Sequence, residues 1–246
     1  MKLAEYSPEI IRFMSDASEY SAYHRDLAAK LSRYLSAYSD ICDAGCGLGY
    51  LSLALSPYCK SVSAVDISPN ALSVLTGNIR DSGCRNIQVV EGDIASCPPG
   101  EPYDAMVFCF FGHTTEALGI AKAQCRGKVI IIKRDREMRR FSLYPQPVAR
   151  QTFSQTCSEL SAMGIPFSSE RFVLEMGQPF RSFGDAATFF RIYSSDGGSG
   201  QVSDPEVESR LVRLESGKYP YYFPCAQQLG IIVIDTGDIP DIKVKN

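Results

Sequence analysis

The sequence predicts a doubly wound α/β fold built around a parallel sheet. Between residues 40 and 135, apolar and β-branched segments alternate with helical segments, and the links between them are short. A cluster of three glycines within Gly45–Gly49 directly follows the first of these segments. Strands and helices that alternate in this way form right-handed crossovers, which place such a turn at the carboxyl edge of the sheet, where ligands bind.

Five strands, taken in chain order, form the core of the predicted sheet. We expect them at Asp40–Ala44, Ser61–Ile67, Asn86–Val90, Tyr103–Phe111 and Lys128–Lys133. We expect the helices between them at Tyr50–Cys59, from Pro69 toward Arg80, and at Thr115–Arg126. Ser68 precedes Pro69, and this pair is typical of a capped helix start. The apolar run at Tyr103–Phe111 is typical of a buried parallel strand.

Both flanks of this region carry weaker patterns. A helical stripe precedes the first strand, with apolar residues at Tyr20, Tyr23, Leu27, Leu31 and Tyr34. After residue 135 we expect helices at Ala149–Met163, Ala186–Tyr193 and Pro205–Glu215, and strands at Arg171–Met176 and Ile231–Asp235. The composition of Ser194–Ser203 predicts a flexible tether.

Composition excludes several classes of protein. The 246 residues carry a net charge of −3, which argues against a generic nucleic-acid binder. No apolar run is long enough to span a membrane, and the first residues lack the apolar region of a signal peptide. The nine cysteines form no Cys-x-x-Cys pair and there are two histidines, so we expect reduced thiols, a cytoplasmic protein and no metal site.

The glycine cluster carries the strongest chemical signal. It reads Asp43-Ala44-Gly45-Cys46-Gly47-Leu48-Gly49 and lies between a strand and a helix. Glycines let the backbone turn tightly and approach a ligand closely. The spacing is G-x-G-x-G, and the Gly-Lys-Ser/Thr ending of a nucleotide-phosphate loop is absent. Asp43 would repel a pyrophosphate, whereas it suits a ligand with an ammonium group.

Two further acids end the next two predicted strands. Asp66 lies 17 residues after Gly49, where a carboxylate can accept hydrogen bonds from both ribose hydroxyls. Asp93 ends the third strand, and its carboxylate can accept a hydrogen bond from an adenine amino group. Acids and glycines at three consecutive strand ends predict a pocket for a cationic ligand that contains adenosine.

Residues 20–135 resemble the class I S-adenosylmethionine-dependent methyltransferases. The resemblance is carried by the glycine cluster, Asp66, Gly92-Asp93 and Tyr103-Asp104. It implies a Rossmann-like sheet of seven strands with the last antiparallel, N-terminal helices, and a helical insertion between the late strands. It also implies S-adenosylmethionine as cofactor and S-adenosylhomocysteine as product. The implied cofactor-binding residues are Asp43, Gly45, Cys46, Gly47 and Gly49 at the methionine end, Asp66 at the ribose, Ile67, Asp93 and Ile94 at the adenine, and Phe110 beside the methyl group.

We therefore interpret the whole chain, residues 1–246, as a single methyltransferase domain. Residues 1–39 would form an N-terminal helical cover, in which Tyr23 and His24 could touch the cofactor. Residues 40–135 would form the cofactor-binding core. Residues 136–246 would hold the late strands, with a substrate cap at about residues 178–222. Nine aromatic residues of this cap, from Phe180 to Phe223, could enclose an acceptor, form an ordinary small core, or form a dimer face.

The acceptor side of the reaction falls where the fourth strand ends, at Phe110-Phe111-Gly112-His113. His113 could take a proton from the acceptor, or it could cap the following helix or face water. The Asn/Asp-Pro-Pro-aromatic motif of nucleic-acid amino methyltransferases is absent, and Pro224-Cys225 lies far from this strand. A basic stretch with Lys133, Arg134, Arg136, Arg139 and Arg140 could hold an anionic acceptor or form a solvated loop.

The function that these observations favour is transfer of a methyl group to a small-molecule acceptor by in-line displacement. An RNA or protein methyltransferase is the alternative within the fold, and a catalytically silent nucleoside-binding module is the alternative outside enzymes. A nicotinamide dehydrogenase is disfavoured by Asp43 and by the glycine spacing. We expect no nucleic-acid partner and no membrane association, and the sequence leaves a homodimer open.

Overall fold

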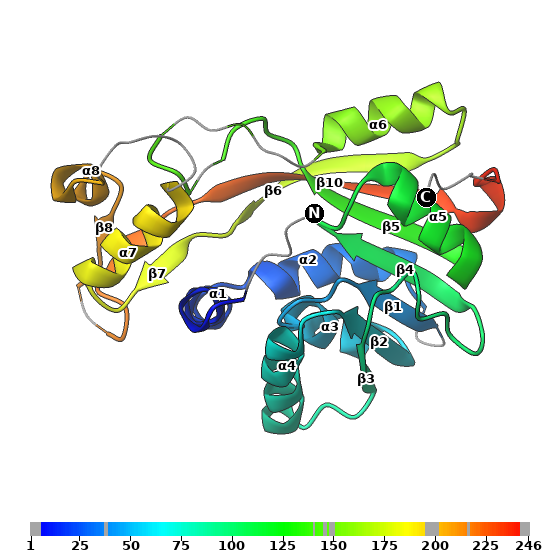
Figure 1. Cartoon of the computed structure of the whole chain (residues 1–246), viewed down its shortest axis with the longest axis horizontal. Coiled ribbons are helices and arrows are strands. Elements are labelled where there is room, and N and C mark those ends of the chain that lie inside the picture. The colour runs from blue at the N-terminus through cyan, green and yellow to red at the C-terminus, as the bar shows by residue number, and fades with distance from the viewer. Residues whose placement is uncertain are drawn as a thin grey trace. The chain divides into compact units, whose positions relative to one another are not determined.

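The computed structural model describes residues 6–36, 39–139, 141–144, 147, 151–194, 202–215 and 217–241. These residues belong to two compact units, which we call the sheet unit and the aromatic unit (Figure 1). The sheet unit comprises residues 24–135, 150–172 and 229–246, and the aromatic unit comprises residues 1–23, 136–149 and 173–228. Arg140 and most of the predicted tether Ser194–Ser203 lie outside the described residues.

The helices and strands follow the predicted order closely through the sheet unit. The helices are α1 (Pro8–Tyr20), α2 (Tyr23–Leu31), α3 (Tyr50–Leu55), α4 (Pro69–Ser82), α5 (Thr114–Gln124), α6 (Phe153–Ala162), α7 (Phe183–Ser194) and α8 (Asp204–Glu208). The strands are β1 (Asp40–Ala44), β2 (Ser61–Asp66), β3 (Ile87–Glu91), β4 (Tyr103–Cys109), β5 (Cys125–Arg134), β6 (Ser168–Glu175), β7 (Gln178–Phe180), β8 (Val212–Arg213), β9 (Tyr221–Phe223) and β10 (Ala226–Asp235). Short 3-10 turns cover Ser32–Tyr34, Ser56–Tyr58 and Thr236–Asp238.

The main sheet has seven strands in the order β3-β2-β1-β4-β5-β10-β6. The pairs among β1 to β5 are parallel, whereas β10 runs antiparallel to β5, with Ile232 opposite Ile131. This arrangement confirms the predicted Rossmann-like fold with an antiparallel last strand. It places the carboxyl ends of β1, β2, β3 and β4 at one edge of the sheet, since parallel strands end on the same side.

Helices cover both faces of this sheet. Successive residues of a strand point to opposite faces, and β2 shows this directly. Val65 belongs to a buried cluster with residues of α5 and α6, whereas Ala64 packs with Leu72 and Leu75 of α4. Figure 1 shows α3 and α4 on one side of the strands and α5 and α6 on the other. The sheet is therefore buried between two layers, as the apolar strand sequences predict.

Several predicted boundaries shift by a few residues for local reasons. Ser68 caps α4 as predicted, because its Oγ accepts the backbone N–H of Ala71 at 3.3 Å. Strand β4 stops at Cys109 because the backbone of Phe110 turns into the left-handed region, with φ of 55°. The predicted stripe from Tyr20 to Tyr34 is not one helix: Tyr20 ends α1, which the sequence analysis did not predict.

The aromatic unit has its own core and its own sheet. Phe13, Phe180, Phe189, Phe190 and Phe223 are buried in one cluster. Their rings meet mostly edge to face, as for Phe13 and Phe189 at 5.3 Å between centroids. The sequence analysis considered three roles for the aromatic residues between Phe180 and Phe223. The buried residues among them form a small core.

A three-stranded sheet in the order β7-β9-β8 extends this core. It corrects two sequence-based expectations. The insertion between β6 and β10 contains strands as well as helices, and the predicted helix Pro205–Glu215 ends at Glu208. Val212 instead pairs with Tyr222 in the antiparallel ladder between β8 and β9, so cross-strand pairing overrides the helical pattern there.

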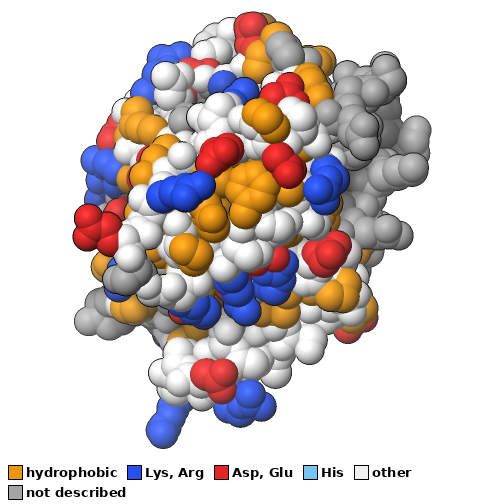
Figure 2. Space-filling model, turned by 90° about the vertical axis from the view of Figure 1, so that its left-hand side faces the viewer, with side chains coloured by type: hydrophobic (Ala, Val, Ile, Leu, Met, Phe, Trp, Pro, Cys, Tyr) orange, Lys and Arg blue, Asp and Glu red, His pale blue; other side chains and the backbone are white. Residues whose placement is uncertain are grey.

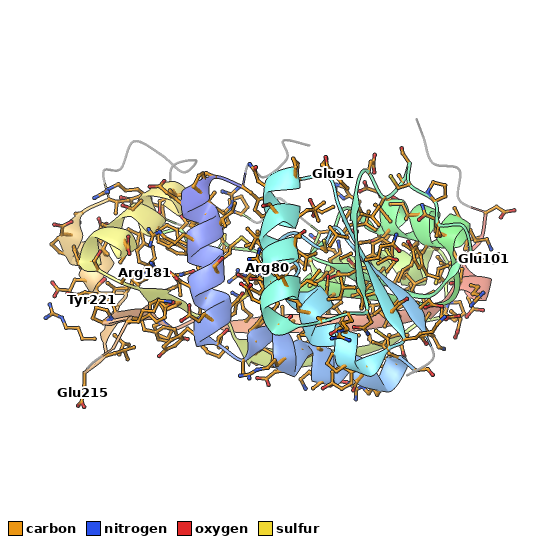
Figure 3. All side chains as sticks on the ribbon, turned by 90° about the horizontal axis from the view of Figure 1, so that it is seen from below. Arg80, Glu91, Glu101, Arg181, Glu215 and Tyr221 are labelled. Carbon is orange, nitrogen blue, oxygen red and sulfur yellow. The ribbon has the colours of Figure 1, made fainter. Side chains whose placement is uncertain are left out.

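Ionic contacts fasten α1 within the aromatic unit. Asp16 is 2% exposed and accepts two hydrogen bonds from Arg181, at 2.6 and 3.0 Å. Tyr219 Oη donates to the same carboxylate at 3.0 Å. Figure 3 shows Arg181 beside this helix. Because a buried carboxylate must be paired, these contacts fix the position of α1 in this unit.

The face of the molecule that carries α7, α8 and β8 mixes both signs of charge. Figure 2 shows Lys and Arg side chains interspersed with Asp and Glu and with apolar residues. Over the described part of this face there is no continuous basic surface. No helix within the described ranges combines the length and the apolar character needed to span a lipid bilayer.

Candidate functional site

The glycine cluster forms a tight turn at the carboxyl end of β1. Gly45, Gly47 and Gly49 have positive φ values of 70°, 55° and 72°, a conformation that other residues rarely adopt. The N–H groups of Gly45 and Cys46 both donate to the carbonyl of Val65, at 2.8 and 3.0 Å. The turn is thereby tied to the end of β2, and α3 begins directly after it.

Asp66 joins this glycine turn to the turn that follows β2. Its Oδ2 accepts the N–H of Gly47 at 2.8 Å, and its Oδ1 accepts the N–H of Ser68 at 2.9 Å. Each carboxylate oxygen keeps further acceptor capacity, since an ionised carboxyl group offers about four lone-pair sites. Asp66 can therefore hold the loop and still accept hydrogen bonds from ribose hydroxyls.

Asp43 is the buried acid of the site. Its side chain is 1% exposed, and Ser52 Oγ donates to its Oδ2 at 2.6 Å. Burial raises the pKa of Asp43 to about 6, and the nearby charge of Asp66 adds to the rise, although the bond from Ser52 opposes it. No basic side chain within the described part of the chain pairs with this carboxylate. A cationic ligand is the partner that would relieve the cost of its burial.

The residues expected at the adenine differ in exposure. Ile67 is an exposed apolar side chain, 43% accessible, directly after Asp66. Asp93 is exposed, and its Oδ1 accepts the N–H of Ala95 at 3.0 Å. Ile94 is 3% exposed and packs in the core, while its carbonyl accepts Gln124 Nε2 at 2.7 Å. Contact of Ile94 and Ile67 with an adenine stays a prediction, and of the two side chains only that of Ile67 is exposed.

The loop from β4 to α5 lies against the glycine turn. The ring of Phe111 is so close to Gly45 that a Cβ on Gly45 would stand 2.6 Å from Phe111 Cδ2. Among the residues that the structure describes, Phe110 is the only non-glycine residue with positive φ. A bulky side chain in this conformation is strained, and such strain concentrates at functional sites. The guanidinium of Arg134 lies 3.8 Å from the centroid of the Phe110 ring.

His113 follows this loop and precedes α5. It is exposed and occupies the N-cap position, where its backbone N–H donates to Glu116 Oε2 at 3.3 Å. The next residue, Thr114, is anchored from outside the helix, because Gln151 Oε1 accepts both its N–H at 3.0 Å and its hydroxyl at 2.6 Å. This exposed position at a helix start agrees with the capping role that the sequence left open, and a catalytic role for His113 stays a prediction.

Comparisons with known proteins agree with this arrangement. A family model described as a methyltransferase domain matches residues 41–127, the segment from β1 to the start of β5. The YcgJ protein of Bacillus subtilis superimposes with a TM-score of 0.56 at 14% identity, over 87% of this chain and 98% of its own. A protein of Bacillus halodurans described as a candidate methyltransferase gives a TM-score of 0.53 at 14% identity, over 85% and 98% of the two chains. No curated protein sequence gives a significant match.

Residues 41–127 thus match a methyltransferase domain model, and the sheet around them has the Rossmann-like methyltransferase fold. The matched segment contains Asp43, the glycine turn, Asp66 and Asp93, which the fold brings to the same edge of the sheet. Their roles toward a cofactor stay predictions, because each was assigned by its resemblance to the family.

Two residues of the sheet unit support this edge, one that the sequence analysis missed and one to which it gave a different role. Ser52 supplies the hydrogen bond to Asp43, and its position within the first turn of α3 is the signal that could have revealed it. Lys133 was predicted as part of a basic stretch, either for an anionic acceptor or as a solvated loop. It is instead 2% exposed, and its Nζ donates to the carbonyls of Phe111 and Gly112, both at 2.7 Å.

His24 of α2 is a further titratable group of the sheet unit. Its ring lies 5.5 Å from that of Tyr50, the residue that follows Gly49. Burial lowers the pKa of His24 to about 4, so its imidazole is neutral at physiological pH. A neutral imidazole adds no positive charge beside the glycine turn. Contact of His24 with a cofactor, expected from the sequence, stays a prediction.

Proposed function

We propose that the chain binds S-adenosylmethionine at the carboxyl edge of its sheet and transfers the methyl group to a small-molecule acceptor. The observation that carries the cofactor is Asp43, a fully buried carboxylate beside a left-handed glycine turn, which no basic side chain of the described residues pairs with. A carboxylate in this setting favours a ligand with an ammonium group and disfavours a diphosphate.

The residues of this edge fit the parts of the cofactor in order. Asp43 and the glycine turn would hold the methionine end, with the carboxylate of Asp43 paired to the ammonium group. Asp66 would accept hydrogen bonds from the ribose hydroxyls. Asp93 would accept one from the adenine amino group, and the exposed side chain of Ile67 would pack on the adenine ring.

When bound, S-adenosylmethionine supplies a methyl group on a sulfonium, and the thioether that departs from this methyl group is already a good leaving group. The protein therefore contributes alignment and exclusion of water. Phe110 and Phe111 follow the end of β4, the ring of Phe111 lies against Gly45, and both would shield the reacting atoms from solvent. Where the acceptor carries a proton at the working pH, His113 would remove it from the acceptor atom.

The small-molecule acceptor is favoured over RNA by charge and by motif. The net charge of the chain is −3, which does not favour binding of a polyanion such as RNA. The sequence lacks the amino-methylating motif of nucleic-acid methyltransferases after β4. The substrate cap that the sequence predicts at about residues 178–222 falls within the aromatic unit, and its role stays a prediction.

Formation of S-adenosylhomocysteine, measured by mass spectrometry, tests this proposal. The protein is incubated with S-adenosylmethionine and, in parallel, with a small-molecule extract, total RNA or unfolded cellular protein. We expect product with the small-molecule extract and none with the other two. Product with RNA or protein alone would assign the acceptor to that class instead. Binding of the cofactor without product in any fraction would favour the silent module. The Asp43→Asn variant, which we expect to lose product formation, controls for contaminating enzymes.

A further inference from the structure

The charged side chain of Lys133 is buried at the end of β5. Its side chain is 2% exposed at the end of β5, and the removal of an ammonium group from water is costly unless strong acceptors replace the water. Lys133 lies two residues after Ile131 and four after Val129, so its side chain points to the same face of the sheet as theirs. Both of these residues belong to the buried cluster that includes residues of α5. Its side chain therefore leaves the sheet on the face of α5, where the β4–α5 loop begins that helix.

Two hydrogen-bond acceptors of Lys133 are consecutive carbonyl groups of that loop. Nζ donates to the carbonyl of Phe111 at 2.7 Å and to that of Gly112 at 2.7 Å. Because a peptide unit is planar, fixing its carbonyl also fixes its N–H on the opposite side. Two carbonyls held by one ammonium group thus set the orientation of the chain between Phe111 and His113.

The loop held in this way presses on the glycine turn. The ring of Phe111 occupies the space that a Cβ on Gly45 would need. The preceding residue, Phe110, holds a strained left-handed backbone at φ of 55°. Such a conformation persists when its surroundings fix it, and the bonds from Lys133 to the two following carbonyls provide that restraint.

Electrostatic proximity agrees with this geometry. Burial raises the pKa of the Cys109 thiol at the end of β4, and the charges of Asp43, Arg134 and Lys133 all act on it. Lys133 therefore lies near the same strand end as the buried acid of the site. Its ammonium group donates to two carbonyls of the loop that packs on Gly45.

We propose that Lys133 is a positioning residue for the methionine end of the cofactor site, acting through Phe111 on the glycine turn. The inference rests on the proposed function, because it assigns the glycine turn to the methionine end. It predicts that loss of Lys133 affects binding of the methionine end of the ligand more than binding of its adenosine end. Loss of Lys133 loosens the loop that packs on Gly45, whereas Asp66 at the adenosine end keeps its hydrogen bond from the N–H of Ser68 at 2.9 Å.

Two ligands separate these ends. S-adenosylhomocysteine contains the amino-acid end, and 5′-methylthioadenosine lacks it while sharing the adenosine and the thioether. Titration calorimetry measures both on the wild type and on Lys133→Met, which keeps the length of the side chain without its donors. We expect S-adenosylhomocysteine to bind about tenfold more weakly to the variant, because the loosened loop no longer holds the glycine turn in place, and 5′-methylthioadenosine to change less than about twofold. Lys128→Met is the matched control, because Lys128 lies on the same strand, pairs with Asp235 at the surface, and should change neither affinity.

The outcomes separate the inference from the function it rests on. If the wild type binds neither ligand, the proposed cofactor is wrong. If the wild type binds both and Lys133→Met weakens both equally or neither, Lys133 is a structural lysine and the inference fails. If Lys133→Met does not fold, the Nζ signal of Lys133 is measured instead by nuclear magnetic resonance on lysine-labelled wild-type protein. The Nζ signal of a buried ammonium bound to carbonyls should shift with S-adenosylhomocysteine and stay in place with 5′-methylthioadenosine, and an equal response to both would overturn the proposal.

Discussion

The carboxylate of Asp66 accepts the backbone N–H of Gly47 at 2.8 Å, so one acid at the end of β2 holds the glycine turn at the end of β1. The sequence analysis assigned Asp66 to a ribose alone. The structure adds a structural role for Asp66, because its other carboxylate oxygen accepts the N–H of Ser68 and the residue thereby links the two turns. A substitution at Asp66 therefore affects the site even before a ligand is added.

Asp66→Ala should lower both stability and affinity. Loss of the two backbone hydrogen bonds should cost about 1–3 kcal/mol of unfolding free energy, because two N–H groups lose their acceptor. Affinity for S-adenosylmethionine should fall about 10- to 100-fold. Thermal melting and calorimetry measure the two effects. Asp81→Ala, which removes an exposed acid paired with Arg80, is the control and should change neither. Unchanged affinity in Asp66→Ala would remove this residue from the site.

Asp43 should make the protein less stable as the pH rises. Its pKa is raised to about 6 in the folded state from an ordinary value of 3.8, so the folded protein binds this proton more tightly than the unfolded chain. The free energy of unfolding should therefore decrease between about pH 4 and pH 6, by on the order of 3 kcal/mol for this group alone. Asp43→Asn, which carries no charge, should melt higher than the wild type at pH 7.5 and close to it at pH 4.5. It should also bind the cofactor more weakly. Equal melting temperatures at pH 7.5 would show that the burial of Asp43 is not costly.

Gly45→Ala should destabilise the glycine turn, because the new methyl group would meet the ring of Phe111 and the backbone has φ of 70°. We expect a loss of about 1–3 kcal/mol, as for other overpacked or strained sites. Gly77→Ala is the matched control: Gly77 lies within α4, and nothing stands within 4 Å of the added Cβ. Alanine there should stabilise the protein by about 0.5–1 kcal/mol. Denaturant unfolding measures both, and two changes of the same sign would contradict the geometry.

Asp16 should be a main support of the aromatic unit. Asp16→Ala removes the shared acceptor of Arg181 and Tyr219, and loss of hydrogen bonds to a buried charged group costs about 1–3 kcal/mol. The effect is measured as a lower melting temperature and as faster hydrogen exchange in peptides of α1. Arg80→Ala, at the exposed pair with Asp81, should leave both unchanged. Equal effects of the two substitutions would mean that the network around Asp16 contributes nothing.

His113→Ala tests the base that the sequence suggested. If His113 removes the acceptor's proton, the variant should lose most turnover with an acceptor found in the screen above, while affinity for the cofactor stays within about twofold. His113→Asn, which keeps a residue favoured at the N-cap, separates chemistry from capping. Full turnover in His113→Asn together with reduced stability in His113→Ala would assign His113 to the helix cap.

The sequence predicted the sheet unit well because local and tertiary preferences agree there. The strand at Asp40–Ala44, the glycine turn and the capped helix after Ser68 follow from apolar alternation, glycine geometry and capping chemistry, and the structure has each of them. The acids at Asp43, Asp66 and Asp93 lie at the same sheet edge because parallel strands end together.

The aromatic unit and the supporting contacts were harder to predict. Strands of three residues, such as Tyr221–Phe223, are too short to show alternation, and their pairing with distant segments decides their conformation. Lys133 has the sequence pattern of a surface charge, because no local signal shows that two carbonyls of a distant loop will satisfy it. Helix α1 groups with residues more than 150 positions away, as the bond from Arg181 to Asp16 shows, and no sequence period records such a contact.

A thermal melt with added cofactor tests the central claim most directly. At about one hundred times its dissociation constant, S-adenosylmethionine should raise the unfolding free energy by about 2.7 kcal/mol, and the melting temperature by roughly 5–10 °C. NAD at the same concentration should leave the melting temperature unchanged, because Asp43 opposes a diphosphate. Stabilisation by NAD in place of S-adenosylmethionine, or by neither, would contradict the assignment of this edge to a cationic nucleoside.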